Sequence, residues 1–318
     1  MSNTAPNPTQ PILRTENLSR KYGDQLALNN LNLSIHPGEV FGYIGPNGSG
    51  KTTTFRILCG LLDPTSGSAH IDGVNVTGNK DLIKQLVGYL PDNFGVYPTL
   101  RVWEYLDFFA AAYKVPKKQR AQRIDECLRI ANAFEFRDKF IGALSRGMKQ
   151  RAGIAKTLLH DPKVIILDEP AATLDPRARV QMRALLRDLA KLGKAVLVSS
   201  HILPELADVC NTVGIIYKGN LVASGPVQDI LRQVRTKKLI EISVLKFENI
   251  AREVLASAPG EWTLMPNEIP DGKLRYEVAA DDTQLAQSLL LLLKKGIPVS
   301  NFGEVQADLE DVFMSLTK

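Results

Sequence analysis

A glycine-rich run near residue 45 has the composition and spacing of a phosphate-binding loop. It fits the pattern GxxxxGK[ST] and comprises Gly45, Pro46, Asn47, Gly48, Ser49, Gly50, Lys51 and Thr52, with Thr53 following. Glycines let the backbone wrap inward so that successive N–H groups point at phosphate oxygens. The lysine would reach the β- and γ-phosphates, and the Thr52 hydroxyl would ligate Mg²⁺. The run therefore predicts binding of a nucleoside triphosphate.

A pair of carboxylates follows an apolar run later in the chain. Residues 164–167 are Val-Ile-Ile-Leu, and Asp168 and Glu169 come directly after them. At the carboxyl end of a parallel strand, Asp168 would face the phosphate loop and hold Mg²⁺ together with Thr52. Because side chains alternate along a strand, we expect Glu169 on the other side, as the group that orients or deprotonates an attacking water. The pair indicates a hydrolytic site.

The segment 144–151 predicts a helix start that can bind an anion. Its sequence is Leu-Ser-Arg-Gly-Met-Lys-Gln-Arg, in which Ser145 is a favourable N-cap residue. The free N–H groups of a first helical turn attract negative charge. Alone, the segment would be only a capped helix, but its position shortly before Asp168 favours a share in the phosphate site.

The elements that position these residues alternate between strands and helices. Continuous apolar runs, typical of buried strands, occur at 40–44, 164–167, 195–199 and 212–217, and helical segments are predicted at 178–192 and 204–210. Such an order implies an α/β fold with a parallel sheet covered on both faces. The alternating runs 12–19 and 31–35 suggest an antiparallel strand pair before the loop. Apolar spacing of i, i+3 and i+4 predicts a helical subdomain inserted at about 99–159.

A second unit is expected from about residue 235, where the composition shifts. Strands are predicted at 239–244, 262–265, 274–278 and 298–305, and helices at 249–256 and 282–294. This βαββαβ order suggests a small ferredoxin-like α+β module, closed by a helix at 309–316. The expected domains are therefore 12–234, which binds nucleotide, and 235–318, which is accessory. Residues 1–11 are polar and proline-rich, and we expect them to be disordered.

The composition of the chain argues against nucleic-acid binding, a disulfide framework, a zinc site and a membrane anchor. The 318 residues carry a net charge of +5, and the basic clusters at 117–120 and 232–238 are interspersed with other residue types, so no nucleic-acid binding is expected. The cysteines, Cys59, Cys127 and Cys210, lie far apart without a C-x-x-C spacing, which fits a reducing cytosol and indicates neither disulfides nor a zinc site. The leucine run at 289–293 is too short to span a bilayer, so no membrane anchor is expected.

Together these motifs resemble the nucleotide-binding subunit of an ATP-binding cassette (ABC) transporter. The run 144–151 is similar to the family signature LSGGQ-x-R, and the similarity extends from about residue 12 to 225. The resemblance implies ATP and Mg²⁺ as ligands, a P-loop cassette fold, and nucleotide contacts from Ser145, Gly147 and Met148. It also implies that Glu169 is the catalytic carboxylate of an ATPase.

The resemblance assigns roles to three further positions. Tyr22 matches the aromatic residue that stacks on adenine, and His201 matches the switch histidine that contacts the γ-phosphate. Residues 173–176, Thr-Leu-Asp-Pro, correspond to the loop that crosses the dimer interface.

The chain departs from the family pattern in two places. Asp92 stands where the family usually has a glutamine, and its shorter, charged side chain can reach the Mg²⁺ shell through water. Arg146 replaces the first glycine of the signature. It either adds charge near the γ-phosphate or projects outward where the backbone needs no positive φ.

The partners implied by the resemblance are protein chains. In the family the signature contacts an ATP held by the opposite protomer, so a head-to-tail homodimer, or a pair with another ABC subunit, is expected. A permease on a separate chain would dock on the helical insert and the Asp92 loop and hold the subunit at the cytoplasmic face of the inner membrane. The segment 309–316 resembles the tail of bacterial ABC-2-type exporter ATPases, which favours export.

Other functions share part of this pattern. The main alternative is a soluble, non-transport ABC ATPase that acts in regulation or on nucleic-acid machinery. Ribosome-acting members usually carry two cassettes, and DNA-repair members carry a long coiled-coil insert; neither feature is found in the sequence. A P-loop small-molecule kinase would share residues 45–52 but would have no reason to carry the Ser145 signature or His201.

Overall fold

The computed structural model divides into two compact units, Met1–Val227 and Gln228–Lys318. It describes residues 10–172, 174–201, 206, 208–230, 238–264 and 273–305. Several sequence predictions lie outside these residues: the helix at 309–316, Thr173, residues 204, 205 and 207 of the helix at 204–210, most of the basic cluster at 232–238 and residues 1–9.

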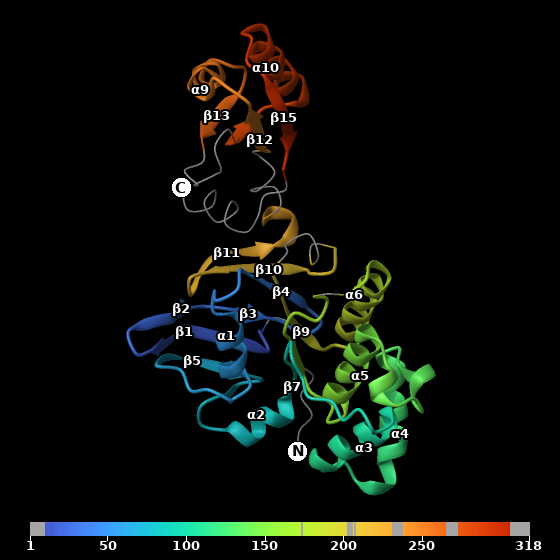
Figure 1. Ribbon diagram of the computed structural model, residues 1–318. Helices are drawn as coiled ribbons and strands as arrows, with labels where there is room; N and C mark the ends of the chain where they lie inside the picture. The colour runs from blue at the N-terminus through green and yellow to red at the C-terminus, as the bar shows by residue number, and fades with distance from the viewer. Residues whose placement is uncertain are drawn as a thin grey trace. The chain divides into compact units, whose positions relative to one another are not determined.

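A mainly parallel sheet forms the centre of the first unit (Figure 1). Its order is β11 (Asn220–Pro226), β10 (Thr212–Tyr217), β4 (Val40–Ile44), β9 (Ala195–Ser200), β8 (Val164–Leu167) and β7 (Val87–Leu90). The strands from β10 to β7 pair in parallel, and β11 is antiparallel to β10. All residues of β4, β8 and β9 are buried, as their continuous apolar sequences predict. The predicted parallel sheet is confirmed.

An antiparallel sheet precedes and follows the loop in sequence. It has the order β2 (Gln25–Leu31), β1 (Leu13–Tyr22), β5 (Ser66–Ile71) and β6 (Val74–Asn75), with β3 (Ser34–Ile35) also paired to β1. The predicted pairing of 12–19 with 31–35 is only partly right, because β1 forms its hairpin with β2. Between β2 and β3, which both pair with β1, the Thr15 hydroxyl of β1 donates to the Leu31 carbonyl and accepts from the Leu33 N–H.

The helices cover both faces of the parallel sheet. Helix α1 (Lys51–Leu58) shares a hydrophobic core with the antiparallel sheet and with residues of β4, β8 and β9. Helices α5 (Arg146–Leu158) and α6 (Pro176–Lys191) contact β7, β9 and β4 and lie on the other side in Figure 1. Helix α2 (Lys80–Leu86) precedes β7.

The predicted helical insert contains α3 (Val102–Ala112), α4 (Lys117–Ile130) and α5, which pack against one another. Short 3₁₀ turns at Phe134–Phe136 and Ile141–Ala143 separate α4 from α5. The insert is therefore helical as expected, although 131–145 is mostly turn.

The second unit has one antiparallel sheet and a separate core. Its elements are β12 (Lys238–Val244), α9 (Glu248–Ala256), β13 (Glu261–Leu264), β14 (Lys273–Ala279), α10 (Asp282–Lys294) and β15 (Val299–Glu304). The strand order is β13-β14-β12-β15. Alternate residues of β12, Ile240 and Ile242, pack with Leu255 of α9 and Leu292 of α10 in one cluster.

The cysteine thiols are free and shielded from solvent. Cys59 and Cys127 are buried and Cys210 is half-buried. Burial raises the pKa of Cys127 and of Cys210 to about 12. Among the described helices, none combines the length and apolar content needed to cross a lipid bilayer.

Candidate phosphate-binding site

Glycines shape the loop between β4 and α1. Gly50 has φ +114°, and a Cβ there would lie 2.7 Å from the Ala27 carbonyl oxygen. A Cβ on Gly45 would lie 2.3 Å from the Ile216 carbonyl oxygen. The loop closes on itself through a hydrogen bond from the Ser49 N–H to the Pro46 carbonyl, 3.2 Å. The predicted strand–loop–helix setting is therefore present, with no room for side chains at these glycines.

Alanine at Gly50 is expected to destabilise the fold more than alanine at Gly48. Gly48 also has a positive φ, +78°, but a Cβ there would meet nothing within 4 Å. Gly50→Ala should therefore cost backbone strain plus a clash, about 2–4 kcal/mol, against about 1 kcal/mol for Gly48→Ala. Thermal unfolding followed by circular dichroism measures both variants. Equal losses would show that the contact with Ala27 is easily relieved.

Lys51 is a buried cation at the centre of the loop. Its side chain is 6% exposed, and its ammonium donates to the carbonyls of Gly45 and Pro46 at 2.5 and 3.2 Å. The carboxylate oxygen Oε1 of Glu169 lies 3.6 Å from Nζ. Burial lowers the pKa of Lys51, while Glu169 and Asp168 act in the opposite direction. The carbonyls and carboxylates thus hold a positive charge where the loop amides converge.

Asp168 connects the loop to the end of β9. Its Oδ2 accepts a hydrogen bond from the Thr52 hydroxyl at 3.0 Å, and its Oδ1 accepts one from the Ser199 hydroxyl at 2.7 Å. The same Ser199 oxygen accepts from the Glu169 N–H at 2.9 Å. Ser199 was missed as a site residue, although a serine at the carboxyl end of a strand adjacent to β8 is a usable signal. It orients both acidic residues at once.

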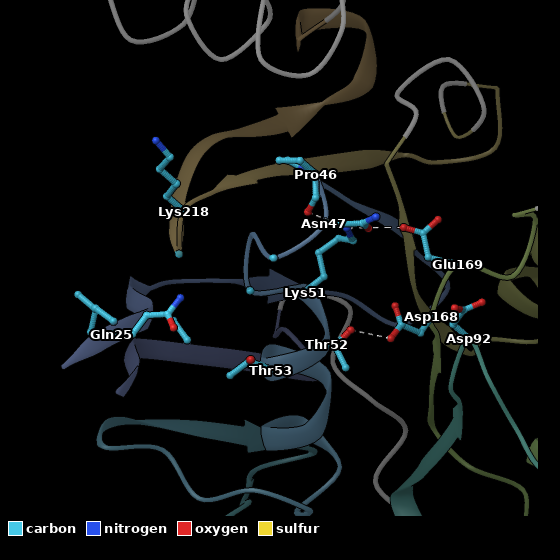
Figure 2. A pocket seen from close by; sticks show the side chains of 15 residues that line it. Gln25, Pro46, Asn47, Lys51, Thr52, Thr53, Asp92, Asp168, Glu169 and Lys218 are labelled. Carbon is cyan, nitrogen blue, oxygen red and sulfur yellow. Dashed lines mark hydrogen bonds and ion pairs between the residues drawn. The ribbon is translucent and has the colours of Figure 1, made fainter. Parts of the chain in front are cut away.

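Glu169 lies on the same side as Asp168, so the expectation that it points to the other side of the strand is wrong. The strand ends at Leu167, and Glu169 has φ +50°, a left-handed conformation that breaks the alternation. Its Oε1 faces Lys51, and its Oε2 lies 3.0 Å from Nδ1 of His201. Figure 2 shows both carboxylates directed at the loop. The Glu169 carboxylate faces Lys51 because the backbone turns at Glu169 itself, after the end of the strand.

Gly45, Ser49 and His201 do not line the cavity that this site encloses. That cavity, the loop cavity, has a volume of about 330 Å³, and the motif residues that line it are Pro46, Asn47, Gly48, Gly50, Lys51, Thr52, Thr53, Asp168 and Glu169. Asp92 lines it, as predicted. Sequence reasoning missed its far wall, which consists of Gln25, Leu26, Ala27, Lys218 and Gly219. The Gly219 N–H donates to the Ser49 carbonyl and its carbonyl accepts from the Asn29 N–H, both at 2.9 Å. A Lys-Gly turn between adjacent strands was the available signal for this wall.

Tyr22 does not line the loop cavity. It ends β1, is 42% exposed, and has the Arg20 guanidinium carbon 4.8 Å from its ring centroid. It lies across the hairpin from Gln25, which does line the cavity. Tyr22 is therefore adjacent to a residue of the cavity wall, its strand partner Gln25, but is not itself part of that wall.

The predicted signature helix lines another cavity, of about 260 Å³, the signature cavity. Ser145 caps α5 by accepting a hydrogen bond from the Met148 N–H at 3.3 Å. Asp175 caps α6 in the same way, accepting from the Ala178 N–H at 2.9 Å. Gly147, Met148 and Leu174 also line this cavity. No described residue lines both the loop cavity and the signature cavity.

Arg146 projects into solvent. It is the first residue of α5, is exposed, does not line the signature cavity, and is not among the described residues with positive φ. An arginine is therefore tolerated where the family signature has a glycine.

Comparison with known proteins gives consistent matches. The family model described as "ABC transporter" matches residues 28–172. The bacitracin transport ATP-binding protein BcrA of Bacillus licheniformis is 36% identical over 96% of this chain and 97% of its own length. The Nod factor export ATP-binding protein I of Ralstonia nicotianae is 30% identical over 96% and 94%. A dimeric post-hydrolysis structure of the ATP-binding cassette MJ0796 with ADP and Pi has a TM-score of 0.60 at 27% identity, covering 68% of this chain and 98% of that one.

Proposed function

This chain belongs to the ATP-binding proteins of ABC transporters, and from this premise we propose that it drives export through a separate, ABC-2-type permease. As a member of this family it is an ATP-binding subunit whose ATP hydrolysis is coupled to transport. The export ATP-binding protein of Ralstonia nicotianae, similar over nearly the whole chain, supports the direction of transport. Attachment to the cytoplasmic face of the inner membrane would then come from the permease.

The loop cavity fits a triphosphate. The first backbone bond of α1 runs from the Thr54 N–H to the Gly50 carbonyl, so the N–H groups of Lys51, Thr52 and Thr53 stand outside the helical ladder and can donate to phosphate oxygens. The buried Lys51 ammonium adds a positive charge. The Ser49 hydroxyl is also buried and has no hydrogen-bond partner in the described part of the chain.

The oxygen atoms beside Lys51 fit Mg²⁺. The Thr52 hydroxyl and the Asp168 carboxylate, 3.0 Å apart, are hard oxygen donors of the type this ion prefers. Among the described residues there is no cluster of three or more histidine, cysteine or acidic side chains that could hold a metal. This suits an ion bound mainly by phosphates and water, with Thr52 and Asp168 as its protein contacts and Asp92 reaching its water shell. When bound, Mg²⁺ would neutralise charge on the phosphates.

Glu169 is the proposed general base. Its carboxylate lies between Lys51 and His201, at the mouth of the loop. There it would accept the proton of a water that attacks the γ-phosphate. His201, 47% exposed, would orient Glu169 through the 3.0 Å contact and reach the γ-phosphate from outside.

Removing the Ser199 hydroxyl should slow turnover more than it weakens ATP binding. Ser199→Ala loses the bonds to Asp168 and to the Glu169 N–H, so both acidic residues lose their orientation. Loss of such a supporting residue typically lowers activity by about 10- to 100-fold. Phosphate release measures the effect, with Ser224→Ala, at an exposed serine of β11, as the matched control. A variant with the parent rate would remove Ser199 from the mechanism.

The separation of the loop cavity from the signature cavity carries the proposal of a head-to-tail homodimer. In one chain no described residue lines both cavities, and Ser145, Gly147 and Met148 do not line the loop cavity of their own chain. A partner turned by a two-fold rotation would bring its Ser145 helix start against the nucleotide on Lys51, with residues 174–176 alongside. The dimeric structure of the MJ0796 cassette with ADP and Pi supports the formation of a dimer.

The test is ATP-dependent dimerisation of the hydrolysis-deficient chain. Glu169→Gln with ATP and Mg²⁺ should elute as a dimer in size-exclusion chromatography, because ATP bridges the protomers and is not consumed. The double variant Glu169→Gln, Lys51→Ala should remain monomeric, since it lacks the phosphate contact. A monomeric Glu169→Gln at saturating ATP contradicts the proposed dimer.

The permease is proposed to dock on the helical insert. A groove of about 1060 Å³ runs between the residues of α2 and β7 and those of α3 and α4. Beside it, Tyr97 and Phe108 are 49% and 53% exposed and their ring centroids lie 5.8 Å apart. Exposed aromatic residues of this kind are enriched at protein interfaces. Co-purification with an integral membrane protein, lost in Phe108→Asp, would test the site.

We also propose that the second unit is a ferredoxin-like module that stabilises the dimer or regulates turnover. Its element order and its antiparallel strand order β13-β14-β12-β15 support that topology. An unchanged dimer and an unchanged ATPase rate after truncation at about residue 233 would remove this role.

A further inference from the structure

Lys156 of α5 is a buried cation with no acidic partner among the residues that the structure describes. It is 9% exposed, and burial alone lowers the pKa of its ammonium. Across the described ranges, no carboxylate lies within ion-pair distance of it. Its Nζ instead lies 5.6 Å from the ring centroid of Phe94 and 5.0 Å from that of Phe109. Ammonium groups are rarely buried without a partner, so these aromatic faces are what compensates the charge.

Phe94 belongs to the loop that carries Asp92. The segment 91–101 connects β7 to α3, and Asp92, which precedes Phe94 by two residues, lines the loop cavity. The Phe94 ring packs against α5 at Gly153, where a Cβ would lie 2.9 Å from its Cζ and 3.0 Å from its Cε2. The missing side chain thus lets the ring seat directly on the helix, next to Lys156.

The same helix carries the signature at its other end. Ser145, the N-cap of α5, lies eleven residues before Lys156, roughly 16 Å along the helix axis at 1.5 Å per residue. Phe109 lies in α3, 5.2 Å between centroids from the exposed Phe108. Lys156 therefore joins three segments: the Asp92 loop, the helix proposed to meet the permease, and the helix that presents Ser145.

We propose that Lys156 is a positioning residue that fixes the Asp92 loop and α3 to α5, so that nucleotide, permease and signature move as one body. This inference rests on the proposed function and identifies a residue that regulates it. Without the ammonium, the start of α5 samples more orientations, and only a fraction of them can close on the partner's nucleotide. Apparent affinity falls in proportion to that fraction.

The test uses the full-length chain with Glu169→Gln, so that ATP-dependent dimers accumulate. Replacing Lys156 by methionine keeps the apolar stem and removes the charge, and should raise the ATP concentration for half-maximal dimer roughly fivefold to tenfold. Lys156→Arg should restore the parent value within about twofold, because a guanidinium also binds aromatic faces. Lys118→Met, at an exposed lysine of α4, is the control and should change nothing.

A variant on the other side of the contact separates positioning from simple packing. Phe94→Leu should shift the midpoint like Lys156→Met, and the double variant should add little, because both remove one interaction. Phe134→Leu is the control, since it removes an exposed cation–π contact with Arg129 at 4.5 Å. Thermal unfolding checks that each variant is folded. If Lys156→Met does not fold, Phe94→Leu is the variant that tests the proposal.

Hydrogen exchange gives a readout that needs no dimer. In the monomer, amides of 91–101 should exchange faster in Lys156→Met than in the parent and in Lys156→Arg. An unchanged midpoint with unchanged exchange, or an arginine variant as impaired as the methionine one, overturns the inference. A parent that never dimerises contradicts the proposed function instead, and exchange alone then decides whether Lys156 holds the loop.

Discussion

Replacing Glu169 by glutamine is expected to lower the rate of ATP hydrolysis by about 10²- to 10⁴-fold, the usual contribution of a general base. Glutamine keeps the size of the side chain and can still contact His201, but it cannot accept a proton from water. ATP binding should be retained or slightly strengthened, because Lys51 no longer has a carboxylate 3.6 Å away that competes for its charge. Phosphate release and equilibrium binding of a fluorescent ATP analogue measure the two quantities.

The control for this variant is Glu126→Gln, an exposed glutamate of α4 paired with Arg123. It should keep the parent rate. If Glu169→Gln retained more than roughly a tenth of the activity, an effect smaller than any general base provides, another residue would be the base.

Replacing Lys51 by alanine is expected to weaken ATP binding by about 2–4 kcal/mol, roughly 30- to 1000-fold in Kd. The alanine removes the buried positive charge and leaves the Gly45 and Pro46 carbonyls without their donor. Arginine should not rescue it, because the 6% exposed ammonium already lies 2.5 Å from Gly45 and a guanidinium is larger. Isothermal titration calorimetry with ATP on the Glu169→Gln background measures the Kd.

Lys191→Met supplies the matched control, since this lysine is 75% exposed and pairs with Asp188, three residues earlier on α6. Unweakened binding in Lys51→Ala would show that the loop amides and α1 alone hold the triphosphate.

Local patterns in the sequence predicted the phosphate-binding loop, the parallel strands and the Ser145 helix start. Each depends on a few neighbouring residues: glycine where side chains do not fit, continuous apolar runs where a strand is buried on both faces, and a serine where a helix begins. Predictions from such patterns hold because the tertiary structure favours the same local conformation. The loop and Asp168 meet as predicted because parallel strands end at one edge of the sheet.

The remaining parts of the site depend on contacts between distant segments. The turn at Lys218 and Gly219 reaches the loop only because β10 pairs with β4, and the Gln25 hairpin only because α1 packs beneath the antiparallel sheet. Glu169 was placed on the wrong side because alternation was extended past the strand's last residue, where φ becomes positive. The role of Ser199 follows from the neighbouring positions of β8 and β9, which no local pattern contains.

Because the native thiols are shielded, they should react little with labelling reagents directed at an introduced cysteine. A thiol with a pKa near 12 is ionised in only about one molecule in 10⁵ at pH 7, and only the thiolate reacts with maleimides. A cysteine introduced at exposed Asn47 or Ser145 would therefore be modified almost alone. In the proposed dimer, such cysteines at Asn47 of one protomer and Ser145 of its partner would lie on either side of the nucleotide, and a short crosslinker could link them without first removing the natural cysteines.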